Sequence, residues 1–136
     1  GNQLMKIVNV KVANIRPKYN NLKEWMDDEN NVYIGRKGIV FIDGIRFPKK
    51  DSIWCNPFKI SKTLSKDKSI KDNERNEVLE KYKVYIKNKL SPSINEEGEN
   101  LINELLKLKG KTLGCWCKPE KCHGDILIEL IKEYEK

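Results

Sequence analysis

The feature that most constrains the fold is a short apolar strand between two amphipathic helices near the end of the chain. Residues 112–117, Thr-Leu-Gly-Cys-Trp-Cys, have the composition of a buried strand. Apolar residues at helical spacing predict a helix over 95–109, which Gly110 ends, and another over 122–135. Helices on either side of a buried strand favour an α/β fold, in which helices cover the faces of a sheet.

The first half of the chain adds strands and a hairpin to this pattern. Segments 5–12 and 32–36 are rich in β-branched residues and predict strands. Asp43 and Gly44 lie between two apolar runs and predict a β-hairpin within 38–47, because both turn positions need positive φ. The remaining expected elements are a loop over 14–21 and helices over 22–28 and 72–90.

These elements predict a single α/β domain over residues 5–136. We expect a small Rossmann-like mixed sheet flanked by helices, with an added β-hairpin. A length of 136 residues suits one domain. We expect Met5 to be the native start, with residues 1–4 a remnant ahead of it.

Composition excludes a membrane-spanning protein and a disulfide-dense secreted one. Charged residues make up 35% of the chain, and no apolar run reaches the ~18 residues that a spanning helix requires. The first residues lack the apolar segment of a signal peptide. We therefore expect a cytoplasmic protein with no membrane partner, whose four cysteines are thiols or metal ligands.

The charge balance is basic, with 27 Lys and Arg against 20 Asp and Glu, and a net charge of +7. Many of the lysines stand beside glutamates in predicted helices, and no basic stripe alternates with aromatic residues. We therefore expect weak, generic nucleic-acid binding at most.

Chemistry-bearing side chains are densest over residues 114–125, Gly-Cys-Trp-Cys-Lys-Pro-Glu-Lys-Cys-His-Gly-Asp. Together with V-Y-I-G-R at 32–36 and W-C-N-P-F at 54–58, this segment resembles an uncharacterised family of small domains from phages, large DNA viruses and bacteria. The resemblance implies a viral or mobile-element source, and hence the host-cell cytoplasm, but no established activity.

The resemblance transfers the family's motif onto individual positions of this chain. These are Tyr33, Gly35, Arg36, Trp54, Asn56, Pro57, Phe58, Lys111, Gly114, Cys115, Trp116, Cys117, Pro119, Cys122, His123, Gly124 and Asp125. Two features depart from the family pattern. Cys55 stands where the family has glycine, and the 37–52 hairpin is longer than usual.

The start of the last predicted helix suits an anion or a reactive thiol. Cys122 and His123 fall in its first turn, where free N–H groups and the helix dipole favour negative charge. A thiolate is stabilised there, and a phosphate finds donors. Cys122, His123 and Asp125 are therefore the candidate catalytic residues, and Gly124 allows close approach of a ligand.

Residues from the two other motifs complete a predicted nucleotide site. Arg36 can clamp a phosphate or carboxylate with two parallel hydrogen bonds. Tyr33 and Trp54 offer flat surfaces for a base, and the Asn56 amide both donates and accepts. The candidate binding residues are Tyr33, Gly35, Arg36, Trp54, Asn56 and Gly124.

A zinc site is the main alternative for the cysteines. Cys115, Cys117, Cys122 and His123 form a Cys₃His set of tetrahedral type, although the spacing C-x-C-x₄-C-H lacks paired C-x₂-C knuckles. Plain structural burial remains a third reading, since cysteine is often a small core residue.

The function expected from the sequence is binding of a nucleotide or nucleoside phosphate, with cleavage or transfer at an N-glycosidic or phosphate linkage if the protein is an enzyme. One alternative is a non-enzymatic viral module that sequesters a signalling nucleotide or binds a host partner. Another is a zinc-stabilised domain that contacts nucleic acid. The sequence identifies no cofactor other than this alternative zinc, and a homo-oligomer stays open.

Overall fold

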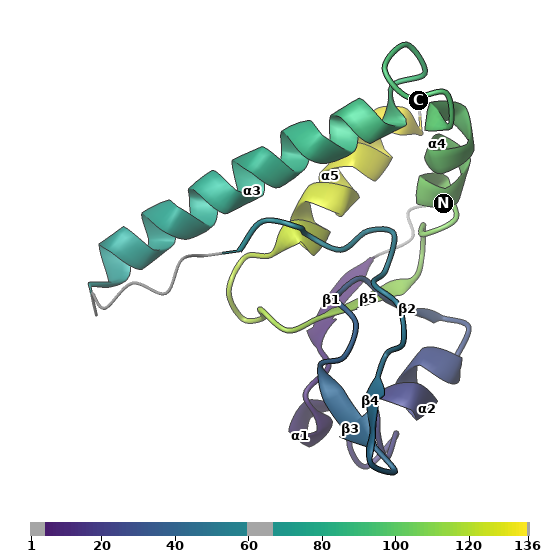
Figure 1. The fold of residues 1–136 in the computed structure, drawn as a ribbon, viewed down its shortest axis with the longest axis vertical. Coiled ribbons are helices and arrows are strands. Elements are labelled where there is room, and N and C mark those ends of the chain that lie inside the picture. Colours follow the sequence, from purple (N-terminus) through teal and green to yellow (C-terminus); the bar gives the residue numbers. More distant parts are fainter. Residues whose placement is uncertain (1–4, 60–66, 136) are drawn as a thin grey trace.

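A computed structural model describes residues 5–59 and 67–135 of the chain. Its main sheet has three parallel strands in the order β1 (Lys6–Asn9), β5 (Thr112–Cys115) and β2 (Asn31–Tyr33), so the strand nearest the C-terminus is central. Strands β3 (Val40–Ile42) and β4 (Ile45–Phe47) pair antiparallel in a separate hairpin (Figure 1).

The register of the three strands divides their side chains between two faces. Leu113 is opposite Ile7 on one side and Val32 on the other, and these residues contribute to one core. At the next register position, Gly114 of β5 is opposite Val8 of β1 and Tyr33 of β2. Val8 and Tyr33 belong to a second core. Successive strand residues point to opposite faces, so both faces of this short sheet are covered.

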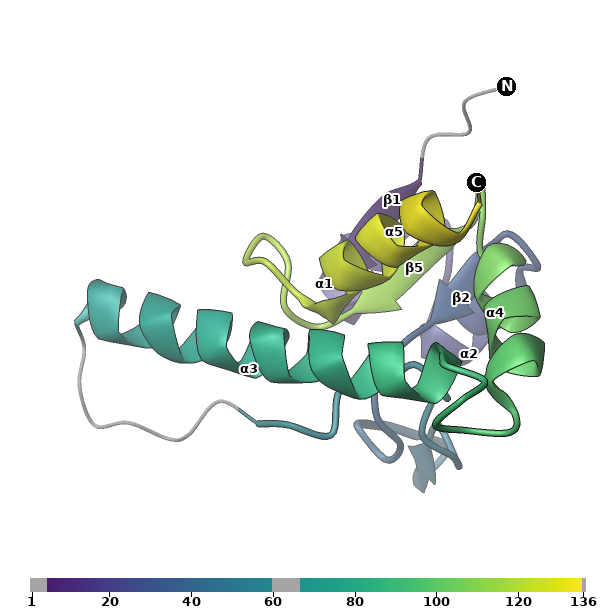
Figure 2. The same cartoon turned by 90° about the horizontal axis from the view of Figure 1, so that it is seen from above.

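Three helices cover the first face: α3 (Lys68–Leu90), α4 (Gly98–Leu106) and α5 (His123–Tyr134). Figure 2 shows α5 lying along the sheet, with α3 beside it and extending past the sheet at its N-terminal end. Their buried residues include Tyr82, Ile86, Leu90, Leu105, Leu127 and Leu130, which pack with Leu113 of the central strand.

Two short helices, α1 (Val12–Ile15) and α2 (Leu22–Asp27), contribute Ile15, Leu22 and Trp25 to the second core. The Trp25 ring of α2 packs directly on Gly114, where a Cβ atom would overlap both this ring and the Val10 side chain. The absence of a side chain at Gly114 therefore allows the tryptophan to approach the central strand.

The hairpin is confirmed, with positive φ at Asp43 (52°) and Gly44 (77°). The expected mixed sheet is wrong, because the hairpin strands pair only with each other and the three main strands are all parallel. Parallel neighbours need long crossover connections, and the helices supply them here.

Several expected boundaries also shift. The first strand ends at Asn9 rather than residue 12, and α1 occupies part of the expected loop. Helix α3 begins four residues early, at Lys68, because the Asp67 side chain caps it by accepting from the Ser69 N–H at 2.8 Å.

Among the described residues, no helix has both the length and the apolar content needed to cross a bilayer.

Candidate functional site

The carboxyl ends of β1, β5 and β2 meet at one edge of the sheet, and a pocket of about 360 Å³ lies beyond it. Four parts of the chain form its walls: the segment after β2, the loop before residue 60, helix α3, and the connection from β5 to α5. Ligands of open parallel sheets gather at this edge, so the pocket is where a binding site is expected.

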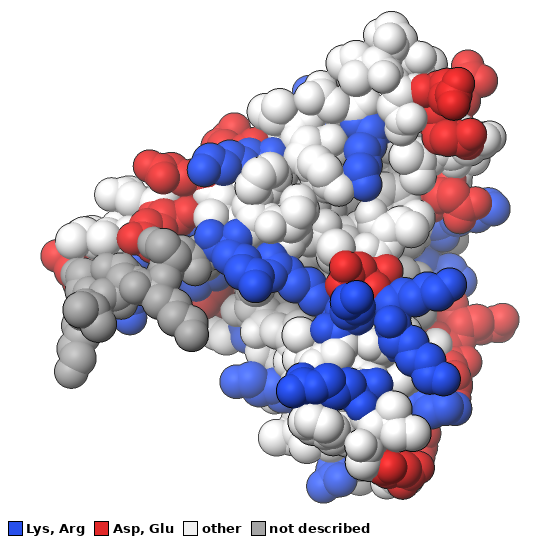
Figure 3. Space-filling view, in the orientation of Figure 1, with Lys and Arg blue, Asp and Glu red and all other residues white. Residues whose placement is uncertain are grey.

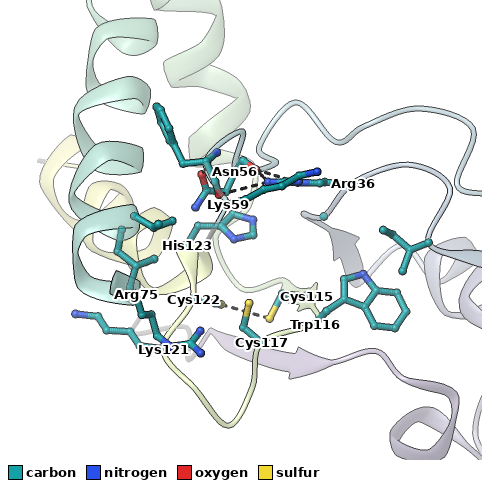
Figure 4. Close-up of a pocket in the computed structure, with 15 residues that line it drawn as sticks. Arg36, Asn56, Lys59, Arg75, Cys115, Trp116, Cys117, Lys121, Cys122 and His123 are labelled. Atoms are coloured by element: carbon teal, nitrogen blue, oxygen red, sulfur yellow. Dashed lines mark hydrogen bonds between the residues drawn. The ribbon is translucent and has the colours of Figure 1, made fainter. Parts of the chain in front are cut away.

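The charged lining of the pocket is cationic. Arg36, Lys59, Arg75 and Lys121 line it, and none of its described lining residues is Asp or Glu. Figure 4 shows Arg75 and Lys121 on one side of a group of sulfur atoms and Trp116 on the other. Such a pocket attracts an anion, because no carboxylate in its lining offsets these charges.

Arg36 is held in place by the loop that follows Trp54. Its Nε and Nη2 donate to the Asn56 carbonyl at 3.1 and 2.7 Å, and Nη2 also reaches the Phe58 carbonyl at 3.3 Å. The Asn56 side chain accepts from the Phe58 N–H at 2.8 Å and fixes this turn. The Asn56 side-chain oxygen is therefore used within its own loop, while the Asn56 backbone carbonyl orients the guanidinium.

Tyr33 and Gly35 stabilise the backbone around Arg36. The Tyr33 hydroxyl donates to the Arg36 carbonyl at 2.7 Å and accepts from Trp116 Nε1 at 2.8 Å. A Cβ at Gly35 would approach this hydroxyl to 2.5 Å, so glycine makes room for the tyrosine. Tyr33 is buried and does not appear among the pocket lining residues, which places it as a support rather than as a stacking surface.

Arg75 has a side-chain N–H donor that lacks an acceptor among the described residues. Its Nε is buried and has no hydrogen-bond partner within the described part of the chain. Its positive charge and a side-chain hydrogen bond both act on the neighbouring Cys117 thiol. A buried N–H donor without an acceptor is costly, so an anion that reached it would be stabilised.

Three cysteines form the floor of the pocket (Figure 4). Cys115 Sγ lies 3.3 Å from Cys122 Sγ. The pKa of Cys115 is lowered by its hydrogen bonds with the thiols of Cys117 and Cys122, helped by nearby backbone N–H groups. The pKa values of Cys117 and Cys122 are raised by their hydrogen bonds with Cys115 and by burial. The hydrogen bonds among the three sulfurs therefore favour the thiolate form of Cys115 over that of Cys117 or Cys122.

His123 lines the pocket in its neutral form. Burial lowers its pKa, and its Nε2 lies 2.6 Å from the Ile34 carbonyl, so this nitrogen carries the proton and donates. Its Nδ1 makes no hydrogen bond to any described residue and is left as an acceptor. The Tyr82 ring packs against the imidazole with centroids 5.1 Å apart.

The first turn of α5 is largely buried, although Cys122 and His123 still line the pocket. Cys122 and His123 are only 1% and 7% exposed. Asp125 accepts from the Cys122 N–H at 3.0 Å and pairs with Lys118 at 3.3 Å, so it caps the helix and is not among the pocket lining residues. Gly124 packs against Ile34 and Ile7 and is likewise outside the lining.

Trp54 is also placed away from the pocket. Its side chain is 4% exposed in the main core, and its carbonyl accepts from the Tyr82 hydroxyl at 2.6 Å. The aromatic residues that line the pocket are instead Phe58 and the half-buried Trp116, neither of which the sequence selected as a binding residue. Lys59, Arg75 and Lys121 were missed as well, since nothing distinguishes them in the sequence from the other cations.

The alternative zinc site is not assembled in this arrangement. Among residues 5–59 and 67–135, no three His, Cys, Asp or Glu side chains are placed to hold a metal ion. His123 directs Nε2 at the Ile34 carbonyl, away from a shared centre with Cys115, Cys117 and Cys122. The Cys₃His set is therefore not grouped around one centre in this structure, and zinc binding stays a prediction.

The fold and site define a small α/β domain with a cationic pocket at the carboxyl edge of its sheet, and three cysteine thiols form the floor of this pocket. The chain belongs to the family described as a domain of unknown function, DUF4326, whose model matches residues 18–133. This confirms the family resemblance expected from the motifs.

Two relatives come from viruses with DNA genomes. The chain is 35% identical over 114 residues to the uncharacterized protein R718 of Acanthamoeba polyphaga mimivirus, covering 78% of this chain and 70% of that protein. It is 42% identical over 41 residues to an uncharacterized 12.4 kDa protein in the nrdA-td intergenic region of Enterobacteria phage T4, covering 30% of this chain and 38% of the phage protein. No solved structure matches the chain.

Proposed function

We propose that this protein binds a nucleotide or nucleoside phosphate in the pocket at the carboxyl edge of its sheet. The observation that carries the proposal is the charge of the pocket, since Arg36, Lys59, Arg75 and Lys121 line it without a carboxylate from the described residues. Its volume of about 360 Å³ is within the range of small-molecule sites.

The proposal assigns the phosphate to the Arg75 side of the pocket. Arg75 Nε is a buried donor that lacks an acceptor, and Lys121 lies on the same side (Figure 4). The indole of Trp116, on the other side of the sulfurs, is the surface on which a base stacks. Arg36 lines the pocket with a guanidinium that the Asn56 and Phe58 carbonyls orient.

A Rossmann-like arrangement is part of this proposal. Support comes from the parallel strands, the helices on both faces, and a pocket beyond the carboxyl ends. If the ligand is turned over at an N-glycosidic or phosphate linkage, the proposed proton acceptor is the neutral His123, whose Nδ1 bonds to no described residue. Asp125 then acts by capping the helix that carries His123.

A thermal shift with a nucleotide panel tests the binding. Nucleoside mono-, di- and triphosphates should raise the melting temperature, while the matching nucleosides should not. Arg75→Ala should weaken the affinity by about tenfold or more, the typical effect of losing a charge-assisted hydrogen bond. Lys71→Ala is the control, because Lys71 is an exposed cation one turn earlier on α3 and is not among the pocket lining residues.

The outcomes of this test separate the alternatives. No shift with any phosphate would remove the proposal. A shift with the ligand recovered unchanged indicates a module that sequesters a nucleotide, whereas a recovered product indicates an enzyme. An equal loss of affinity in Arg75→Ala and Lys71→Ala would show generic attraction in place of a site.

Weak nucleic-acid binding is a second candidate, favoured by a shallow cationic depression beside the hairpin. Lys37, Arg46 and Lys49 line it with Gly38 and Pro48. Figure 3 shows Lys and Arg side chains gathered over the half of this face that contains the hairpin. Affinity for single-stranded DNA that falls steeply with salt, and falls further in Lys37→Ala with Lys49→Ala, is the expected result.

A further inference from the structure

The three sulfurs on the pocket floor form a chemical group that nucleotide binding does not require. Cys115 and Cys122 are each 1% exposed, and their Sγ atoms are 3.3 Å apart. Cys117 contacts the same group but is only partly buried. Cys115 and Cys122 are therefore buried thiols, and Cys117 is the more accessible thiol of the group.

We propose that Cys117, Cys115 and Cys122 form a thiol–disulfide exchange centre that accepts small anionic disulfides through the pocket. Cys117 is the entry thiol, and the oxidised resting state is a disulfide between Cys115 and Cys122. This activity is independent of the nucleotide proposal, since it rests on the sulfur arrangement rather than on phosphate binding.

The charge distribution of the group explains how Cys117 becomes a nucleophile. In the proposed starting state Cys115 is the thiolate, a form that its hydrogen bonds with the two other thiols favour. When a disulfide RSSR contacts Cys117, the Cys117 proton can pass to Cys115 along their hydrogen bond as Cys117 attacks. Arg75 stabilises negative charge on Cys117 during this step.

The exchange balances in three displacements. Cys117 Sγ bonds to one sulfur of RSSR, the S–S bond breaks, and RS⁻ leaves. Cys115 Sγ then attacks Cys117 Sγ and displaces the second RS⁻, forming a Cys115–Cys117 disulfide. Cys122 Sγ attacks Cys115 Sγ and displaces Cys117 as a thiolate beside Arg75.

Atoms and electrons are conserved across this sequence. The two protons of the starting group leave with two RSH molecules, and its single negative charge ends on Cys117. RSSR is reduced to two thiols, and Cys115 and Cys122 are oxidised to one disulfide. The small disulfide is the only oxidant that the sequence of steps needs.

The cationic lining predicts which disulfides react. Arg36, Lys59, Arg75 and Lys121 line the same pocket as Cys117, so an anionic disulfide is attracted and a cationic one is repelled. Glutathione disulfide and cystamine provide this contrast, because they carry opposite net charges. Raising the salt concentration should reduce the difference between their rates.

The test is a timed reaction of the reduced, full-length protein with each probe, followed by intact mass and peptide mapping. The expected product has lost two hydrogens, with Cys115 and Cys122 in one linked pair, after a transient glutathione adduct on Cys117. Glutathione disulfide should react faster than cystamine.

Three cysteine variants test which thiol acts in each displacement step. Cys117→Ser should slow oxidation by at least about tenfold, because the remaining thiols are shielded from the probe. Cys122→Ser should stop at a Cys115–Cys117 disulfide. Cys55→Ser is the matched control and should react as the wild type does, because this partly buried cysteine lies outside the group.

Several results would overturn the proposal. These are a glutathione adduct that persists on Cys117 with no internal disulfide, unchanged oxidation in Cys117→Ser, and equal rates with both probes. Stoichiometric zinc that protects all three thiols until a chelator removes it would also overturn it. If a variant fails to fold, the order in which wild-type cysteines become modified still decides the entry thiol.

Discussion

Trp116 Nε1 donates to the Tyr33 hydroxyl at 2.8 Å, and the two rings meet edge to face at an angle of 79°. The same hydroxyl donates to the Arg36 carbonyl at 2.7 Å. One buried tyrosine from β2 therefore positions both an aromatic wall of the pocket and the backbone of one of its cations.

Replacing Tyr33 with phenylalanine should weaken both stability and ligand binding. The change leaves Trp116 Nε1 and the Arg36 carbonyl without their partner, at a cost of about 1–3 kcal/mol in the free energy of unfolding. Urea denaturation and the nucleotide thermal shift measure the two effects. Tyr134→Phe is the control, since the Tyr134 hydroxyl bonds to no described residue, and an equal loss there would contradict the assigned role.

An alanine at Gly114 should be strongly destabilising. Its Cβ would overlap the Trp25 ring and the Val10 side chain within a packed core, and such overpacking costs about 1–3 kcal/mol. Gly124→Ala provides the comparison, because the nearest atoms there are flexible isoleucine ends at 3.0 Å. Chemical denaturation should give the larger loss at Gly114, and the reverse order would contradict the packing argument.

His123 should make the stability of the fold depend on pH. Its pKa is lowered by burial in the folded state, so the unfolded chain binds the proton more tightly. The contribution is therefore complete above the unfolded pKa of about 6.5 and is lost as the pH falls below it towards the folded pKa. Denaturation at about pH 7 and about pH 5 should show this loss.

The variant His123→Gln isolates this group. Glutamine cannot take up the proton, and its amide can still donate to the Ile34 carbonyl. The fall in stability between the two pH values should therefore shrink in this variant. An unchanged fall would assign the effect to other groups.

Variants of Asp125 distinguish a helix-capping role of its carboxylate from a catalytic role. Asp125→Ala should cost about 1 kcal/mol of stability, because the Cys122 N–H loses its acceptor. Asp125→Asn keeps an acceptor oxygen and should recover most of this stability. If turnover is found, asparagine should preserve it as well, and full loss of turnover in a stable Asp125→Asn would instead support acid–base catalysis.

Local patterns in the sequence were enough to predict most elements of the fold. The period of apolar residues located α3, α4 and α5, and the Asp43-Gly44 pair located the hairpin turn. These patterns succeed because helix periodicity and positive φ depend on neighbouring residues alone. The pairing of strands was not predictable in this way, which is why the expected mixed sheet was wrong.

The candidate site was only partly predictable for the same reason. Sequence motifs selected Arg36 and the three clustered cysteines, which the pocket does bring together. They also selected Trp54 and Asp125, whose aromatic ring and carboxylate are used in the core and in a helix cap. Residue type alone does not distinguish a side chain that faces a ligand from one that supports it.

By itself, the amino-acid sequence determined the helices, the hairpin turn, the family and the presence of a thiol-rich segment after the last strand. Only the tertiary structure decided that Arg75 on α3 lies close enough to act on Cys117, and that Trp116 rather than Trp54 lines the pocket. It also decided that the first turn of α5 is largely buried at the pocket floor. Bonding preferences within a turn or strand are local, whereas the distance between residues far apart in the chain is set by how the helices pack on the sheet.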